Sequence, residues 1–97
     1  MIYTVGQIRE KTTPVAKAHG LQSVYLFGSY ARGEATEQSD IDLRIVSPTV
    51  LSLFELGGLY ADLEESLQKE LDLVNTRGAE DDFLNRIRED EVLLYEV

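Results

Sequence analysis

The sequence predicts a small α/β (α+β) domain, in which a small mixed β-sheet carries helices packed on it. Short apolar runs rich in β-formers, such as 24–27 and 92–95, alternate with longer segments whose apolar residues recur every three or four positions. Alternation of this kind is typical of a layered domain with one sheet. The 97 residues contain no repeat and no linker, so we expect a single domain over residues 1–97.

The first helix is expected to begin after Thr4, a good N-cap residue, and to end at His19-Gly20. Pro14 lies inside this segment and is expected to kink or restart the helix, because proline lacks the backbone N–H that a helix interior uses. The apolar residues within this helix are Val5, Ile8, Val15 and Ala18.

Two predicted strands enclose a short helix and a polar loop. In order, these are a buried strand at 24–27, a helix at 29–32, a loop at 33–39 and a strand at 40–46. Side chains alternate along a strand, so Asp40 and Asp42 share one face of the second strand. The opposite face carries Ile41, Leu43 and Ile45.

The second half of the chain is expected to begin with a long helix at Ser47-Pro48, since proline is tolerated in a first turn. Gly57-Gly58 weakens this helix by about 1 kcal/mol per glycine. Its apolar stripe is Leu51, Phe54, Leu59, Leu63 and Leu67. The remaining segments are a strand at 71–75, a loop at 76–80, a helix capped by Asp81 or Asp82 that ends near Glu89, and a β-prone end at 92–97.

The segment that combines Gly28-Ser29 with Asp40-x-Asp42 is where we expect chemistry. A Gly-Ser turn that opens a helix offers free backbone N–H groups to phosphate oxygens. Two neighbouring carboxylates repel each other unless a cation lies between them, and Mg²⁺ prefers such oxygen ligands. Alone, a Gly-Ser pair is usually a turn and an Asp-x-Asp is often a solvated edge or a cap. Their joint occurrence, each next to a predicted strand, indicates nucleotide chemistry.

Asp72 is a third candidate ligand, placed inside the apolar run 71–75. Burying a carboxylate without a partner is unfavourable, and the penalty falls if Asp72 joins Asp40 and Asp42 beside a metal ion. The structural alternative is that Asp72 lies at the exposed end of its strand or caps a loop.

The charge balance limits the class of partner. Nine basic and 18 acidic residues give a net charge of −9, which argues against direct nucleic-acid binding. This charge suits a small nucleotide delivered with its metal, or a basic protein partner, although solubility explains most surface acids. The sequence has no cysteine, no segment apolar enough to span a membrane and no signal-peptide pattern at its start, so a cytoplasmic protein is expected.

These residues resemble the minimal nucleotidyltransferases of the DNA polymerase β-like superfamily over nearly the whole chain. That superfamily combines Gly-Ser, a spacer, Asp-x-Asp and a later strand Asp, matched here by Gly28, Ser29, Asp40, Asp42 and Asp72. The run 28–43 is typical of the prokaryotic minimal enzymes.

The resemblance implies a polymerase β-like fold and transfer of AMP from ATP, with release of pyrophosphate. Asp40 and Asp42 would hold Mg²⁺, with two ions expected. Asp72 would complete the metal site on the acceptor side and help to remove the acceptor's proton.

The resemblance also implies that Ser29 and the backbone around Gly28 bind the β- and γ-phosphates of ATP. Arg32 has two interpretations: it neutralises phosphate charge, or it forms a surface salt bridge with Glu34 or Glu37. Tyr30 is expected to pack rather than to react.

Similar proteins are antitoxins whose partner is a helical HEPN-family RNase toxin, which they bind and modify with AMP on a tyrosine. The resemblance implies the same activity here. One alternative is a catalytically weak or inactive antitoxin that neutralises its toxin by binding. Another is a transferase with a small-molecule acceptor, but relatives of that kind carry a second domain for which this chain has no room.

Arg44 departs from the family pattern, since relatives commonly carry an apolar residue there. It follows Asp42 on the same predicted face. The sequence leaves three interpretations: Arg44 pairs with an acid, contacts a phosphate, or weakens metal affinity by adding positive charge. The acidic runs 80–82 and 89–91 are expected to be solvated faces or helix caps.

Overall fold

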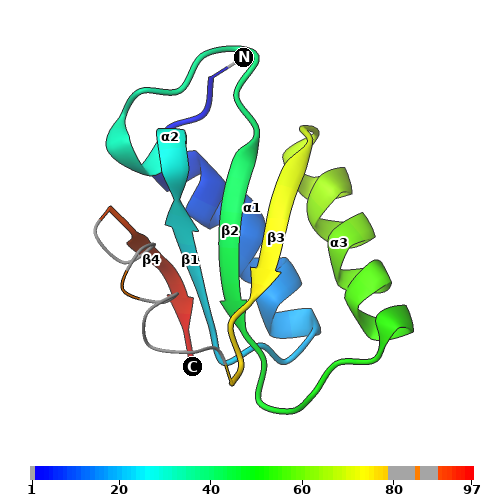
Figure 1. Cartoon of the computed structure of the whole chain (residues 1–97). Helices are drawn as coiled ribbons and strands as arrows, with labels where there is room; N and C mark the ends of the chain where they lie inside the picture. The colour runs from blue at the N-terminus through cyan, green and yellow to red at the C-terminus, as the bar shows by residue number, and fades with distance from the viewer. Residues whose placement is uncertain (1, 79–84, 86–89) are drawn as a thin grey trace.

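The protein is described by a computed structural model that covers residues 2–78, 85 and 90–97, and its fold is a four-stranded mixed sheet with helices. The elements are α1 (Val5–Ala18), β1 (Ser23–Phe27), α2 (Gly28–Arg32), β2 (Ile41–Val46), α3 (Leu53–Leu67), β3 (Leu71–Asn75) and β4 (Val92–Glu96). The strand order is β3-β2-β1-β4 (Figure 1). β2 and β3 are parallel, whereas β1 is antiparallel to both β2 and β4. The predicted fold class is therefore confirmed.

The sheet has one covered face and one face that carries polar residues. Figure 1 shows α1 behind the sheet and α3 along its β3 edge. The alternate residues of β2 that point into this layer, Ile41, Leu43 and Ile45, are fully buried, and so are Leu59 and Leu67 of α3. Asp42 and Arg44 point the other way, because side chains alternate along a strand. The core thus fixes which face of β2 carries the acidic residue.

The ends of α1 agree with the prediction, but the helix runs through Pro14 without a break. Thr4 and Gln7 form a capping box: the Thr4 hydroxyl accepts from the Gln7 N–H at 3.1 Å, and the Gln7 side chain accepts from the Thr4 N–H at 2.8 Å. The helix ends at Ala18, with His19 as its C-cap residue. It does not restart at Pro14, because buried residues on both sides of the proline hold one continuous helix against the core. Thr12 and Ala16 are buried on either side of the proline, whereas Ala18 is exposed at the end of the helix.

α3 begins at Leu53, not at Ser47-Pro48 as predicted. Ser52 and Glu55 form its capping box: the Ser52 hydroxyl accepts from the Glu55 N–H at 3.0 Å, and the Glu55 carboxylate accepts from the Ser52 N–H at 3.2 Å. The Ser47 hydroxyl instead donates to the Thr49 carbonyl in the loop before the helix. Phe54 is 91% exposed, so its placement in the inward stripe was wrong.

The strands lie where the sequence predicted them, with one shift that concerns the site. β2 begins at Ile41, so Asp40 precedes the strand instead of starting it. The predicted helix between Asp81 or Asp82 and Glu89 lies outside the described residues. Among the residues that the structure describes, no helix has both the length and the apolar character needed to cross a membrane.

Candidate active site

The candidate site is built around the close approach of Gly28 to Asp42. Gly28 is the first residue of α2, directly after β1, and its φ of +76° lies in the left-handed region. A Cβ atom added at Gly28 would lie 2.9 Å from Cγ of Asp42 and closer still to its carboxylate oxygen Oδ2. Both the backbone angle and the lack of space require glycine, which explains why the turn begins with this residue.

Asp42 and Asp72 are neighbours across the parallel pair β2–β3. They are aligned in the register of the two strands, so their side chains lie on the same face of the sheet. The pKa of Asp42 is raised from 3.8 to about 6, first by desolvation and then by a hydrogen bond and charge repulsion from Asp72, with a smaller contribution from Asp40. Desolvation and the neighbouring acids therefore favour the protonated form of the Asp42 carboxyl group.

Asp40 is exposed and lies one residue before β2. The negative charge of Asp40 repels that of Asp42 and so contributes to the raised pKa of Asp42. No set of three acidic or histidine side chains within residues 2–78, 85 and 90–97 is already arranged as a metal cage. The donor set nevertheless fits a hard divalent cation, because carboxylate oxygens are its preferred ligands and a cation would relieve the repulsion between the neighbouring acids.

Ser29 and Arg32 both lie on α2, beside the acidic pair. Ser29 is the half-buried second residue of this helix. The Arg32 Nε atom lies 3.1 Å from the Glu34 carboxylate, and a second guanidinium nitrogen lies 4.0 Å from Asp90. The charge of Arg32 also lowers the pKa of Asp42. Both interpretations of Arg32 therefore keep support: it forms the surface salt bridge with Glu34, and it contributes positive charge to the site.

Tyr30, also on α2, packs as expected: it is buried, and its hydroxyl has no hydrogen-bond partner among the described residues.

Two residues near the site, Tyr60 and Lys69, were not assigned to it from the sequence. The Tyr60 hydroxyl of α3 donates to the Leu71 carbonyl at 3.2 Å, next to Asp72. Its pKa is raised by desolvation and by nearby acids that include Asp72 and Asp40. The Lys69 ammonium donates to the Glu37 carbonyl at 3.1 Å and so ties the loop before Asp40 to the end of α3. Both contacts join residues that are distant in the sequence, so no local motif predicts them.

Arg44 pairs with an acid, which decides among its three interpretations. Its guanidinium donates to both Glu91 carboxylate oxygens, at 2.9 and 2.8 Å, and to the Thr76 hydroxyl at 3.0 Å. It also stacks on the Tyr25 ring at 3.9 Å. Glu91 is thus not a solvated surface acid, as the sequence suggested, because its side chain is only 13% exposed. The Arg44 charge is therefore paired within the fold.

Replacing Glu91 with alanine is expected to destabilise the protein by about 3–5 kcal/mol, because it leaves the buried Arg44 guanidinium without its counterion. Chemical denaturation measures this loss. The double variant Arg44→Met, Glu91→Leu is the matched control, and we expect it to be more stable than Glu91→Ala because it removes both charges. A loss below about 1 kcal/mol for Glu91→Ala would show that the pair is not buried as described.

The metal-free protein is expected to lose stability as the pH rises through the interval from 3.8 to about 6. Asp42 has a raised pKa in the fold, so the folded state binds more protons than the unfolded state in this interval. Because Asp42 is partly exposed, solvent screening reduces the effect to about 1 kcal/mol. Denaturation of the wild type and of Asp42→Asn across this interval isolates the contribution. The two proteins should differ most above about pH 6, and a constant difference at all pH values would contradict the raised pKa.

The chain matches one protein family and several curated relatives. Residues 10–97 match the family described as "Polymerase beta, Nucleotidyltransferase". A protein of Methanocaldococcus jannaschii, provisionally named a protein adenylyltransferase, is 40% identical over 70 residues, which cover 72% of this chain and 75% of that protein. The protein adenylyltransferase MntA of Shewanella oneidensis is 37% identical over 59 residues, which cover 61% of this chain and 42% of that protein.

Solved structures have the same fold. A crystal structure described as a toxin–antitoxin with AMP-PNP contains a chain with a TM-score of 0.79 and 26% identity, covering 92% of this chain and 73% of that one. A complex of a tri-AMPylated Shewanella oneidensis HEPN toxin with its MNT antitoxin gives a TM-score of 0.74 at 23% identity, covering 97% of this chain and 74% of that one. At 23% identity, the similarity to this complex shows the fold alone.

Proposed function

The chain belongs to the polymerase beta nucleotidyltransferase family, and from that premise we propose that it transfers AMP from ATP to a tyrosine hydroxyl of a HEPN-family toxin and thereby acts as an antitoxin. The family uses a nucleotide substrate and a divalent metal. The name of MntA, a protein adenylyltransferase, supports a protein acceptor. The toxin–antitoxin complex that contains AMP-PNP supports both the partner class and ATP.

The observation that carries the proposal is the pairing of Asp42 with Asp72 directly beside Gly28. Two carboxylates from adjacent parallel strands face the N-terminal turn of α2, whose first residue leaves no room for a side chain. A triphosphate placed against that turn would bring its α-phosphate beside the acids. We assign phosphate binding to Gly28 and Ser29, with Arg32 exchanging its contact with Glu34 for one with phosphate.

In the reaction, the tyrosine oxygen bonds to the α-phosphorus of ATP, and the bond from that phosphorus to the oxygen bridging to the β-phosphate breaks. Pyrophosphate leaves, and Asp72 accepts the phenolic proton. Asp40 and Asp42 would hold Mg²⁺, and two such ions would neutralise the triphosphate and stabilise the in-line displacement. Because Asp40 is exposed and precedes β2, its carboxylate can turn toward Asp42 when the nucleotide binds.

Neutralisation of Arg44 favours an active enzyme over an antitoxin that works by binding alone. The positive charge of Arg44, which could have weakened metal binding, is paired with Glu91. ATP and a toxin RNase meet in the cytoplasm, which is the location that we propose for the reaction.

Intact-mass spectrometry of the neighbouring gene's product, incubated with this protein, ATP and Mg²⁺, tests the proposal. We expect the mass of that product to rise by about 329 Da or a multiple, the increment for AMP. The increase should disappear when Mg²⁺ is chelated. A stable complex without any mass increase would instead support neutralisation by binding alone.

A further inference from the structure

The start of α3 and the loop before it expose large apolar side chains in one place. Val50, Leu53 and Phe54 are 82%, 86% and 91% exposed. Single exposed apolar residues are ordinary, but three within five positions form a patch of the kind that marks an interaction site. In Figure 1 this end of α3 lies at the opposite end of the sheet from α2 and the start of β2. A partner bound here would leave the acidic residues accessible.

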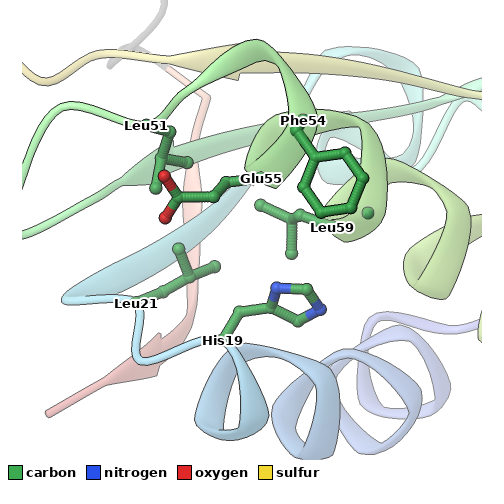
Figure 2. Close-up of a pocket in the computed structure, with 7 residues that line it drawn as sticks. His19, Leu21, Leu51, Phe54, Glu55 and Leu59 are labelled. Carbon is green, nitrogen blue, oxygen red and sulfur yellow. The ribbon is translucent and has the colours of Figure 1, made fainter.

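A hollow of about 240 Å³ lies beside this patch. Figure 2 shows it between the end of α1 and the first turns of α3, with His19 and Leu21 facing Leu59 and Phe54 at its rim. His19 is held at the edge by a 2.7 Å contact with Asp62. Because the lining is mostly apolar, the hollow can receive an apolar side chain from another molecule.

Gly57 and Gly58 are a second, independent feature of the same helix. Neither has a positive φ, and a Cβ atom at either position would meet nothing within 4 Å. The fold therefore has room for larger residues, which would favour the helix more than glycine does. With Phe54 and Ala61, these glycines form an exposed strip at helical spacing on which the backbone of another helix can approach closely.

The charged side chains of α3 itself are acidic, although Arg77 donates to the Pro48 carbonyl in the loop before the helix. Residues 45–68 contain four acids and no lysine or arginine, and three of the acids, Asp62, Glu64 and Glu65, lie in the second half of α3. A second copy of the chain would bring like charges together, whereas a basic partner would be attracted.

We propose that the α3 surface, formed by Val50, Leu53, Phe54, Gly57 and Gly58, docks an amphipathic helix of the toxin. That helix places apolar side chains on Phe54 and in the hollow, and lysine or arginine over the acidic half of α3. The identity of the partner rests on the proposed function, whereas the docking surface rests on exposure, helix composition and charge. Docking and AMP transfer would then use separate parts of the molecule.

The test measures the affinity of the neighbouring gene's product for the wild type, Phe54→Asp and Gly57→Gln by isothermal titration. We expect Phe54→Asp to weaken binding about thirtyfold, as for a central interface aromatic. Gly57→Gln is expected to raise the melting temperature by about 2–4 °C, because it removes a helical glycine, and yet to weaken binding. Val97→Asp is the matched control, since Val97 is 87% exposed and is not among the residues that line the hollow, and it should bind like the wild type.

Mass spectrometry on the same samples separates this proposal from the proposed function. We expect Phe54→Asp to raise KM for the partner and to leave kcat unchanged. AMP transfer with equal affinity for the wild type, Phe54→Asp and Gly57→Gln would overturn the docking surface and keep the enzyme. Binding that depends on Phe54, without any AMP transfer, would support the docking surface and overturn the proposed enzymatic function. No complex with the wild type, or a wild-type homodimer that Phe54→Asp dissociates, would also overturn the docking proposal.

Discussion

Replacing Asp42 with asparagine is expected to lower AMP transfer at least about a thousandfold and to leave the protein folded. Asp42 is the central acid of the candidate site. It is aligned with Asp72 on the neighbouring strand, and its carboxylate lies against Gly28. The charges of Asp40 and Arg32 both change its pKa. The variant keeps the shape of the side chain and removes the negative charge that a cation needs. The metal-free variant should be somewhat more stable than the wild type, because a repelling carboxylate has been removed.

Glu10→Gln is the matched control for this prediction. It makes the same carboxylate-to-amide change on an exposed acid of α1, a residue that belongs neither to the candidate site nor to the α3 surface. The transfer rate, measured from the mass increase of the partner over time, should stay within about twofold of the wild type for Glu10→Gln. Comparable rates for Asp42→Asn and the wild type would remove Asp42 from the catalytic site.

Replacing Gly28 with alanine is expected to lower AMP transfer at least about a hundredfold. The new Cβ atom would overlap the Asp42 carboxylate, so that either α2 or Asp42 must move. Movement of about 1 Å in a metal-binding and phosphate-binding constellation is enough for a loss of this size. The protein should also lose stability, because alanine is strained at a φ of +76°.

Gly20→Ala separates these two effects. Gly20 has a comparable φ of +66°, but a Cβ atom there meets nothing within 4 Å. Denaturation should show that both alanine variants lose stability, whereas the partner's mass increase should slow only for Gly28→Ala. If both variants transfer AMP at the wild-type rate, the approach of Gly28 to Asp42 has no role in the reaction.

The boundaries of α3 show where local sequence was misleading. Pro48 suggested that the first turn of α3 lies at that position. Ser52 and Glu55 carry a second signal, a capping box, and the helix begins there. The predicted apolar stripe of α3 included both Phe54 and Leu59, which are five residues apart. At about 100° per residue the two side chains are about 140° apart around the helix, so Phe54 faces outward. The sequence contained both signals, and packing decided between them.

The acidic pair could be predicted from the sequence, whereas its surroundings could not. Asp42 and Asp72 belong to strands whose apolar alternation fixes which way they point. The partner of Arg44 is 47 residues away, and the contact of Tyr60 with the Leu71 carbonyl depends on how α3 lies against the β3 edge. Periodicity predicts the face of an element, but only the tertiary arrangement decides which residues meet across it.

The position of the transferred phosphate tests the central claim most directly. The protein is incubated with Mg²⁺, the neighbouring gene's product and ATP radiolabelled at either the α- or the γ-phosphate. Nucleotidyl transfer predicts that the α-label becomes bound to the partner and that the γ-label leaves as pyrophosphate. Label on the partner from the γ-phosphate alone would show phosphorylation, and would contradict the assignment of this site to AMP transfer.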